Sequence, residues 1–237
     1  VVHTTADHWV DRELLDRRGV RLLTLPGYAT TTVAEQAMAM LLTLSRRTHL
    51  SDDRARNRIG DEVSLRGFEL RGRRLGLIGH GRIGQEIERL ATAFGLDVVI
   101  ADPLSPVHRP LDDILDTAEL IMLAASHRRG SPPIIGGAEL DRMRARYLIN
   151  PSCRELFDHD AVARALRRRE LDGYAVDDIV EALNDPGIEP GRVVQTMHTG
   201  WYADEAMERG VDAWVANIIE AASAIDATAA GDLEAVG

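Results

Sequence analysis

Residues 75–102 read LGLIGHGRIGQEIERLATAFGLDVVIAD and decide the fold class of this chain. The stretch predicts a buried strand, a glycine-rich turn at residues 79–84, an amphipathic helix and a second strand that ends at Asp102. An acid at this distance from the turn binds the ribose hydroxyls of an adenosine and repels a 2′-phosphate. The pattern therefore predicts a dinucleotide-binding βαβ unit that takes NAD in preference to NADP.

Each glycine of the turn has a separate physical task. Gly79 permits the tight exit from the strand, Gly81 lets a diphosphate approach the backbone, and Gly84 lets the helix pack close to the sheet. The N–H groups of Arg82 and Ile83, at the start of the helix, would receive the phosphates. The alternative is a glycine turn that binds nothing. The complete order of strand, turn, helix, strand and aspartate favours the binding site.

Composition limits the classes of partner and compartment. The chain has 237 residues, 45% of them hydrophobic and 28% charged, and its formal net charge is −10. This acidic balance argues against a nucleic acid or an anionic membrane as partner. A single cysteine, Cys153, excludes an internal disulfide and predicts a reducing, cytoplasmic environment. No metal-ligand spacing is present, and the opening with Val1 in a strand-like segment suggests that a preceding segment is missing.

The rest of the chain alternates strands with helices, which predicts a doubly wound parallel sheet of the α/β class. Strands are expected near residues 75–79, 97–101, 119–124, 146–150, 173–177 and 192–196. Helices are expected near residues 83–95, 111–118, 137–143, 158–169 and 202–225.

The first 72 residues give weaker signals. They predict a strand at 1–5, a helix at 11–18 and a strand at 20–25, and then a capping box at 32–35 that opens a helix to about Arg47. The apolar face of that helix is broad, which fits either core packing or an additional contact with a second subunit. Residues 48–72 are polar and predict an irregular connection.

Over nearly its whole length, the chain resembles the D-2-hydroxyacid dehydrogenase family, which includes phosphoglycerate, glycerate, formate and phosphite dehydrogenases. The resemblance rests on the stretches DRRGVRLLTLPGYATTTVAEQAMAMLLTLSRR, LRGRRLGLIGHGRIG, LDRMRARYLINPSCRELFDHDAVARAL, GYAVD and QTMHTGWYADEA. It implies a remnant of a flavodoxin-like substrate domain at 1–26, an NAD-binding Rossmann domain at 27–203, and a helix and tail at 204–237 that return toward the substrate domain. It also implies a homodimer.

The resemblance implies a site for hydride transfer to or from a small 2-hydroxy or 2-keto acid. Members of the family use a His–Glu pair for the proton and an Arg for the substrate carboxylate. His198 matches the family histidine by motif and place. Arg154 and Glu181 each lie one residue away from the family positions, which hold Cys153 and Ala182 here. We predict His198, Arg154 and Glu181 as the catalytic set, with Asp178 as a further candidate acid.

The cofactor side of the resemblance is more complete. Besides the glycine turn and Asp102, it assigns Ser152, Cys153, Asp177 and Gly200 to the cofactor site, with Asp177 near the nicotinamide. Cys153 is interpreted as a small buried thiol that lines this site, because no neighbouring base that would activate a nucleophile is visible in the sequence.

Three functions remain open from the sequence. The first is an NAD-dependent oxidoreductase on a small 2-hydroxy or 2-keto acid, with a rearranged carboxylate clamp. The second is an NAD-binding regulatory or scaffolding protein that has lost catalysis. The third is a biosynthetic enzyme with an unusual substrate. The two off-register positions motivate the second and the third.

Overall fold

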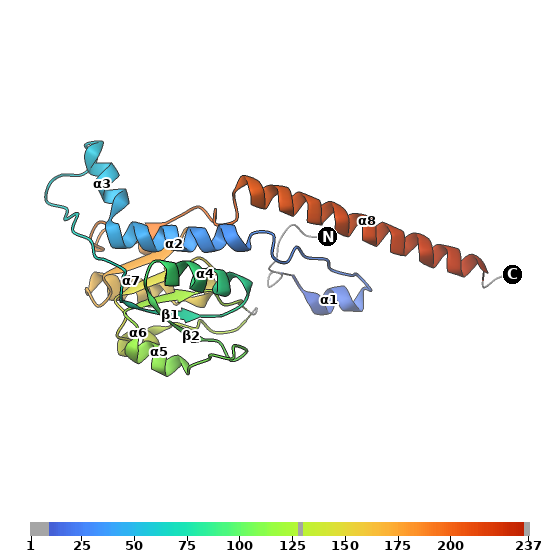
Figure 1. The fold of residues 1–237 in the computed structure, drawn as a ribbon, viewed down its shortest axis with the longest axis horizontal. Coiled ribbons are helices and arrows are strands. Elements are labelled where there is room, and N and C mark those ends of the chain that lie inside the picture. Colours follow the sequence, from blue (N-terminus) through green and yellow to red (C-terminus); the bar gives the residue numbers. More distant parts are fainter. Residues whose placement is uncertain (1–9, 128–129, 235–237) are drawn as a thin grey trace. The chain divides into compact units, whose positions relative to one another are not determined.

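The computed structural model describes residues 10–127 and 130–234. The chain forms two compact units, one of residues 30–201 and a smaller one of residues 1–29 with 202–237 (Figure 1). The larger unit contains the whole sheet. Its limits lie close to the predicted Rossmann domain at 27–203, while the origin of the smaller unit in a substrate domain stays a prediction.

The larger unit is built on a six-stranded sheet in which every pair of neighbours is parallel. The strand order is β2-β1-β3-β4-β5-β6. The strands are β1 (Arg74–Ile78), β2 (Asp97–Ala101), β3 (Leu120–Leu123), β4 (Tyr147–Asn150), β5 (Gly173–Val176) and β6 (Val193–Gln195). The order reverses between β1 and β3, and ligands of such sheets bind outside the carboxyl ends of the strands at this reversal. The prediction of a doubly wound Rossmann sheet is confirmed.

Helices cover both faces of the sheet, which explains why its central strands are continuous apolar runs. One face packs on α2 and α4, and the opposite face on α5 and α7 (Figure 1). The helices of this unit are α2 (Thr30–Arg46), α3 (Thr48–Ala55), α4 (Arg82–Ala93), α5 (Leu111–Thr117), α6 (Gly137–Arg142) and α7 (His159–Arg167). Two short 3-10 turns follow β4 and β5, η1 (Arg154–Leu156) and η2 (Glu181–Leu183).

Two predictions before residue 72 are wrong. Gly27, at φ +89°, makes the turn that precedes α2, and the helix begins at Thr30. Thr32 therefore lies inside the helix and forms no capping box with Glu35. The polar connection at 48–72 contains α3, in which Leu50 is the one buried residue. A helix held by one apolar side chain has no periodic pattern that the sequence could reveal.

The smaller unit contains α1 (Arg12–Arg17) and α8 (Asp204–Glu234). The predicted strand at 1–5 lies outside the described residues, and the predicted strand at 20–25 is wrong. Side chains of α8 bind the backbone around that segment, since Asn217 Nδ2 donates to the Thr24 carbonyl at 3.1 Å and Arg209 Nε to the Tyr28 carbonyl at 2.9 Å. Within the segment 20–25, the Thr24 carbonyl is thus bound by a helix side chain and not by a neighbouring strand.

The long helix α8 also extends beyond the predicted end at residue 225. Several of its large apolar side chains are exposed, namely Val211, Trp214, Val215, Ile218 and Ile219. Even so, no helix in the described part of the chain is apolar over a length that would cross a bilayer.

Candidate functional site

Two glycines of the turn after β1 are required by the packing around them. Gly79 has φ +94°, and a Cβ there would lie 2.6 Å from backbone atoms of Ala124, the residue that follows β3. A Cβ on Gly84 would press on the Gly79 carbonyl. The ends of β1 and β3 and the start of α4 therefore approach one another as closely as their backbones allow, at the point where the strand order reverses.

Gly81 is different, because its surroundings are open. No atom lies within 4 Å of the position that its Cβ would take. Gly81 is the N-cap of α4, and no side chain in the described part of the chain caps this helix. The first N–H groups of a helix have no partner within it, so those of Arg82 and Ile83 are left for an acceptor. Open space next to unpaired amides at a positive helix end fits a diphosphate.

Asp102 follows β2 and is held by two backbone amides. Its Oδ2 accepts from the His80 N–H at 2.7 Å and its Oδ1 accepts from the Leu104 N–H at 2.9 Å. These two hydrogen bonds lower the pKa of the Asp102 carboxyl, so it stays ionised near neutrality. Each carboxylate oxygen still has a free lone pair. Asp102 is thus oriented and able to accept hydroxyl groups of a ribose.

His80 has a role that the sequence pattern did not predict. Its ring joins the glycine turn to two other segments, with Nδ1 3.1 Å from Ser105 Oγ and Nε2 2.8 Å from Glu88 Oε2. The ring is mostly buried, at 12% side-chain exposure. Any residue can occupy the second position of the pattern GxGxxG, so the sequence did not indicate a role for His80. Its contacts with Ser105 and Glu88 hold the glycine turn in place before any ligand binds.

Asp177, at the end of β5, organises the turn that carries His198. Asp177 is 4% exposed. Its Oδ1 accepts from Thr196 Oγ1 at 2.5 Å and from the Thr199 N–H at 3.0 Å, and its Oδ2 accepts from the Gly200 N–H at 2.6 Å. His198 lies inside this turn with φ +55°, a conformation that non-glycine residues rarely adopt. The buried carboxylate therefore holds the strained backbone that presents His198.

Gly200 is needed for the same reason, because a Cβ there would lie 2.6 Å from Asp177 Oδ2. The sequence interpretation missed Thr196, whose signal was only a threonine directly after the last strand. The contact between Asp177 and a nicotinamide stays a prediction.

Replacing Asp177 by asparagine tests this arrangement. The amide NH2 at the Oδ2 position would face the Gly200 N–H, and charge-assisted hydrogen bonds would be lost. We expect the free energy of unfolding to fall by about 3 kcal/mol, measured by urea denaturation. Asp178→Asn is the matched control, because the Asp178 carboxylate accepts a hydrogen bond from its own neighbour, the Ile179 N–H. Equal stability of the two variants would contradict the account.

The structure does not join His198 to Glu181. Both side chains are exposed, and no hydrogen bond or ion pair connects them in the described part of the chain. Gln195 in β6 holds the backbone just before Glu181, since its Oε1 accepts from the Val180 N–H at 2.7 Å. Ala182, at the family position of the glutamate, is partly buried against the core. His198 is therefore presented without the predicted carboxylate partner.

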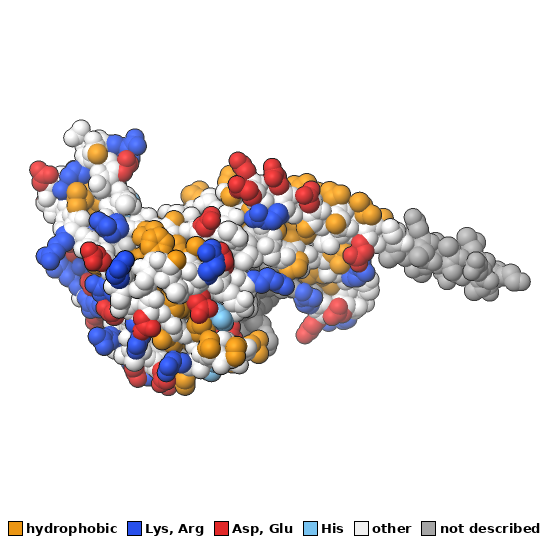
Figure 2. Space-filling view, viewed as in Figure 1, with side chains coloured by type: hydrophobic (Ala, Val, Ile, Leu, Met, Phe, Trp, Pro, Cys, Tyr) orange, Lys and Arg blue, Asp and Glu red, His pale blue; other side chains and the backbone are white. Residues whose placement is uncertain are grey.

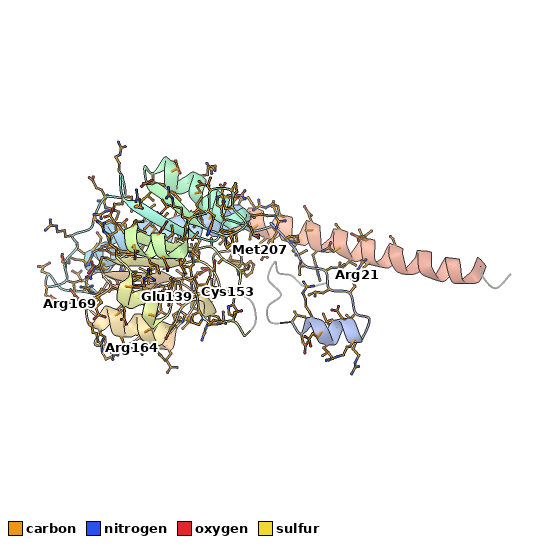
Figure 3. The ribbon with its side chains drawn as sticks, turned by 90° about the horizontal axis from the view of Figure 1, so that it is seen from below. Arg21, Glu139, Cys153, Arg164, Arg169 and Met207 are labelled. Atoms are coloured by element: carbon orange, nitrogen blue, oxygen red, sulfur yellow. The ribbon has the colours of Figure 1, made fainter. Side chains whose placement is uncertain are left out.

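Arg154 and Cys153 lie on the loop after β4 (Figure 3 labels Cys153). The Arg154 side chain is exposed, and its Nη1 donates to the Ile179 carbonyl at 3.5 Å, so it extends toward the end of β5. Burial, followed by the nearby Glu155, raises the pKa of the Cys153 thiol. A protonated, half-buried thiol fits the predicted lining role and not a nucleophile.

The loop after β4 is tied down beneath these residues. Ser152 Oγ donates to the Leu123 carbonyl at the end of β3, at 3.1 Å. The buried Asn150 side chain donates to the Cys153 carbonyl at 3.2 Å and accepts from the Ser152 N–H at 3.1 Å. Ser152 thus links the ends of two strands. No group of His, Cys, Asp and Glu side chains among the described residues could hold a metal ion.

The sequence of the larger unit matches a known family. Residues 38–200 match the sequence profile of the D-isomer-specific 2-hydroxyacid dehydrogenase NAD-binding domain. The chain belongs to this family. NAD is therefore the cofactor of the larger unit, and its glycine turn, open helix start and Asp102 fit that cofactor. The chain carries the NAD-binding domain of a family of NAD-dependent oxidoreductases.

Individual relatives agree with this assignment. A hydroxypyruvate reductase of Thermotoga maritima is 26% identical over 212 residues, which are 84% of this chain and 69% of that protein. A D-3-phosphoglycerate dehydrogenase of Escherichia coli is 28% identical over 214 residues, which are 84% of this chain but 52% of that protein. The chain thus spans about half the length of the latter enzyme.

Solved structures show the same fold. A Thermus thermophilus protein superposes with a TM-score of 0.76 at 29% identity, over 88% of this chain and 70% of that one. The Aquifex aeolicus D-lactate dehydrogenase, solved with NAD and lactic acid, superposes with a TM-score of 0.78 at 23% identity, over 98% of this chain and 76% of that one.

Proposed function

We propose that this 2-hydroxyacid dehydrogenase relative binds NAD at the carboxyl edge of its sheet and oxidises or reduces a small 2-hydroxy or 2-keto acid. One observation carries the proposal: the uncapped start of α4 opens onto free space at Gly81, next to the fixed carboxylate of Asp102. In this assignment the amides of Arg82 and Ile83 bind the diphosphate, and Asp102 binds the adenosine ribose.

The chain's own residues supply binding and proton transfer, while NAD supplies the hydride acceptor or donor when bound. His198, in the turn held by Asp177, is proposed to exchange a proton with the substrate hydroxyl or carbonyl oxygen. Arg154 is proposed to bind the substrate carboxylate, to which a guanidinium fork is matched. Since Arg154 is exposed and bound only weakly to a carbonyl, it is able to turn toward a substrate.

The experiment that tests the proposal follows NADH oxidation at 340 nm with a panel of small 2-keto acids, among them pyruvate, glyoxylate and hydroxypyruvate. Turnover with at least one acid, absent with the corresponding amides, is the expected outcome. Tight NADH binding without turnover of any 2-keto acid would contradict the proposed catalysis and would still support the proposed NAD binding.

Asp102→Asn is expected to change cofactor choice. The asparagine loses the charge that grips the ribose hydroxyls and repels a 2′-phosphate. We expect NADH affinity to fall about tenfold and the preference for NADH over NADPH to shrink by a larger factor, measured as dissociation constants for both cofactors. Asp97→Asn is the control, since Asp97 lies at the opposite end of β2 and pairs with Arg74. An unchanged NADH-to-NADPH ratio in Asp102→Asn would refute the assignment.

A second candidate function is NAD binding without catalysis, in a regulatory or scaffolding protein. It is favoured by two observations: the His198 side chain forms no hydrogen bond or ion pair with a carboxylate among the described residues, and Cys153 stands where the family pattern has its arginine. A partner whose affinity changes with the NADH concentration would support this function.

We also propose a cytoplasmic homodimer, as the family resemblance implies. On the broad apolar face of α2, Ala34, Met38, Leu41 and Leu44 are buried against the unit's own sheet and α4, while Val33 and Leu42 of that face are only partly buried. Sedimentation of the full chain would measure the oligomeric state.

A further inference from the structure

A pocket lies at the amino-terminal edge of the sheet, remote from the glycine turn. Its volume is about 280 Å³, and its lining comes from residues that precede or begin β1, β3, β4 and β5. In a parallel sheet the first residues of all strands lie at one edge, and the carboxyl ends of the strands, where the cofactor binds, lie at the opposite edge. Figure 3 shows the two edges at opposite ends of the larger unit, marked by Arg169 and Cys153. The pocket therefore belongs to neither the cofactor nor the substrate site.

Two of its three arginines are already neutralised. Arg73 Nη1 lies 2.7 Å from Glu119 Oε2. Arg146 forms a two-pronged pair with Asp172, with both N–O distances at 3.1 Å. These pairs fix the two guanidinium groups in place. Both acids of the pocket, Glu119 and Asp172, are therefore partners of arginines.

The polar groups of Arg144 and Tyr147 take no part in these ion pairs. In the described part of the chain, the Arg144 guanidinium has no hydrogen-bond or ion-pair partner, and the Tyr147 hydroxyl has no hydrogen-bond partner. Burial raises the pKa of the Tyr147 phenol, so it remains a neutral donor. The lining residues include three arginines and two acids, so the lining is positively charged on a chain of net charge −10, and Asp172 is shared with a further arginine, Arg192, outside the lining. Unused donors with a surplus positive charge fit an anion.

One wall of the pocket is aromatic. The Phe68 and Tyr147 rings lie 4.5 Å apart, tilted by 41°, and the Arg73 guanidinium stands 4.8 Å from the centre of the Phe68 ring. Both rings are partly exposed. Figure 2 shows blue arginine side chains gathered along the left edge of the larger unit. A planar ligand group would find apolar ring surface beside its anionic end.

We propose that this pocket binds a small anion joined to a planar ring, of the aryl phosphate class. Arg144 and the Tyr147 hydroxyl bind the phosphate oxygens, and the Phe68 and Tyr147 rings contact the planar group. Arg73 and Arg146 stay paired with their acids and form the walls around the bound anion. The proposal is independent of the proposed function, because the cofactor site lies at the other edge of the sheet.

Calorimetric titration of the full chain with phenyl phosphate, inorganic phosphate and phenol tests the proposal. Saturating NADH is present, so that the other anion site is occupied, and the ionic strength is held constant. Phenyl phosphate is expected to bind more tightly than inorganic phosphate, and phenol not at all. Arg144→Gln is expected to weaken phenyl phosphate binding about tenfold or more, and Tyr147→Phe several-fold. Arg142→Gln, which removes an arginine paired with Asp112 and Asp116 on the surface, should leave the affinity unchanged.

Three results would overturn the proposal: no heat with phenyl phosphate, equal affinity for wild type and Arg144→Gln, or an equal loss in Arg142→Gln. If Arg144→Gln fails to fold, the Tyr147→Phe comparison decides alone. If NADH itself does not bind, the proposed function fails, while the loss in Arg144→Gln relative to Arg142→Gln still locates the anion at this pocket.

Discussion

Gly81→Asp is expected to weaken NAD binding by at least about a thousandfold while leaving the fold intact. The fold tolerates the side chain because no atom lies within 4 Å of the Cβ position and the φ of −71° suits any residue. Binding does not tolerate it, since the new carboxylate stands where the diphosphate must lie. It repels the phosphates and occupies the helix amides, each of which contributes about 1.5–3 kcal/mol as a charge-assisted hydrogen bond.

Fluorescence titration with NADH measures this effect, and thermal denaturation followed by circular dichroism measures folding. Gly137→Asp is the matched control. It adds the same charge at the first residue of α6, where the Cβ position is also open. The control should bind NADH as the wild type does. If the Gly81→Asp variant bound NADH with wild-type affinity, the claim that the diphosphate binds at this turn would be wrong.

His198→Ala is expected to lower kcat about 100-fold to 10,000-fold, the usual contribution of a general acid–base group. The dissociation constant for NADH should stay unchanged, because the ring is exposed and the turn is held by Asp177 through backbone amides and Thr196. Steady-state kinetics on the best 2-keto acid, with NADH titrations of the same protein, separate the two effects.

Arg154→Ala serves as the comparison for the histidine variant. Loss of a carboxylate-binding guanidinium should raise KM for the keto acid, with kcat reduced less than in His198→Ala. Retained KM in Arg154→Ala, with activity lost in His198→Ala, would favour a substrate without a carboxylate. Full activity of His198→Ala would contradict the proton-transfer role.

The cofactor half of the site could be predicted because the residues that form it lie close together in the sequence. Gly79, Gly81 and Gly84 act through their own missing side chains within six consecutive residues, and Asp102 ends the next strand. The spacing alone therefore predicted both the turn and the carboxylate that faces it. The alternation of apolar runs likewise predicted all six strands, since a parallel sheet covered on both faces has continuous apolar strands.

The rest of the site depends on contacts between distant parts of the chain. Asp177 reaches Thr196 and Gly200, and Gln195 reaches back to Val180, through bonds that no spacing rule encodes. The strand predicted at 20–25 failed for a related reason, because α8, almost 200 residues later, binds the Thr24 carbonyl of that segment. Local propensity could not anticipate a partner so far along the chain.

Calorimetric titration of the full chain with NADH and with NADPH tests the central claim most directly. The claim is that the uncapped start of α4 and the carboxylate after β2 together hold NAD. The account predicts saturable heat with NADH, one site per chain, and clearly weaker binding of NADPH. Absence of binding by either nucleotide to the folded protein would contradict it.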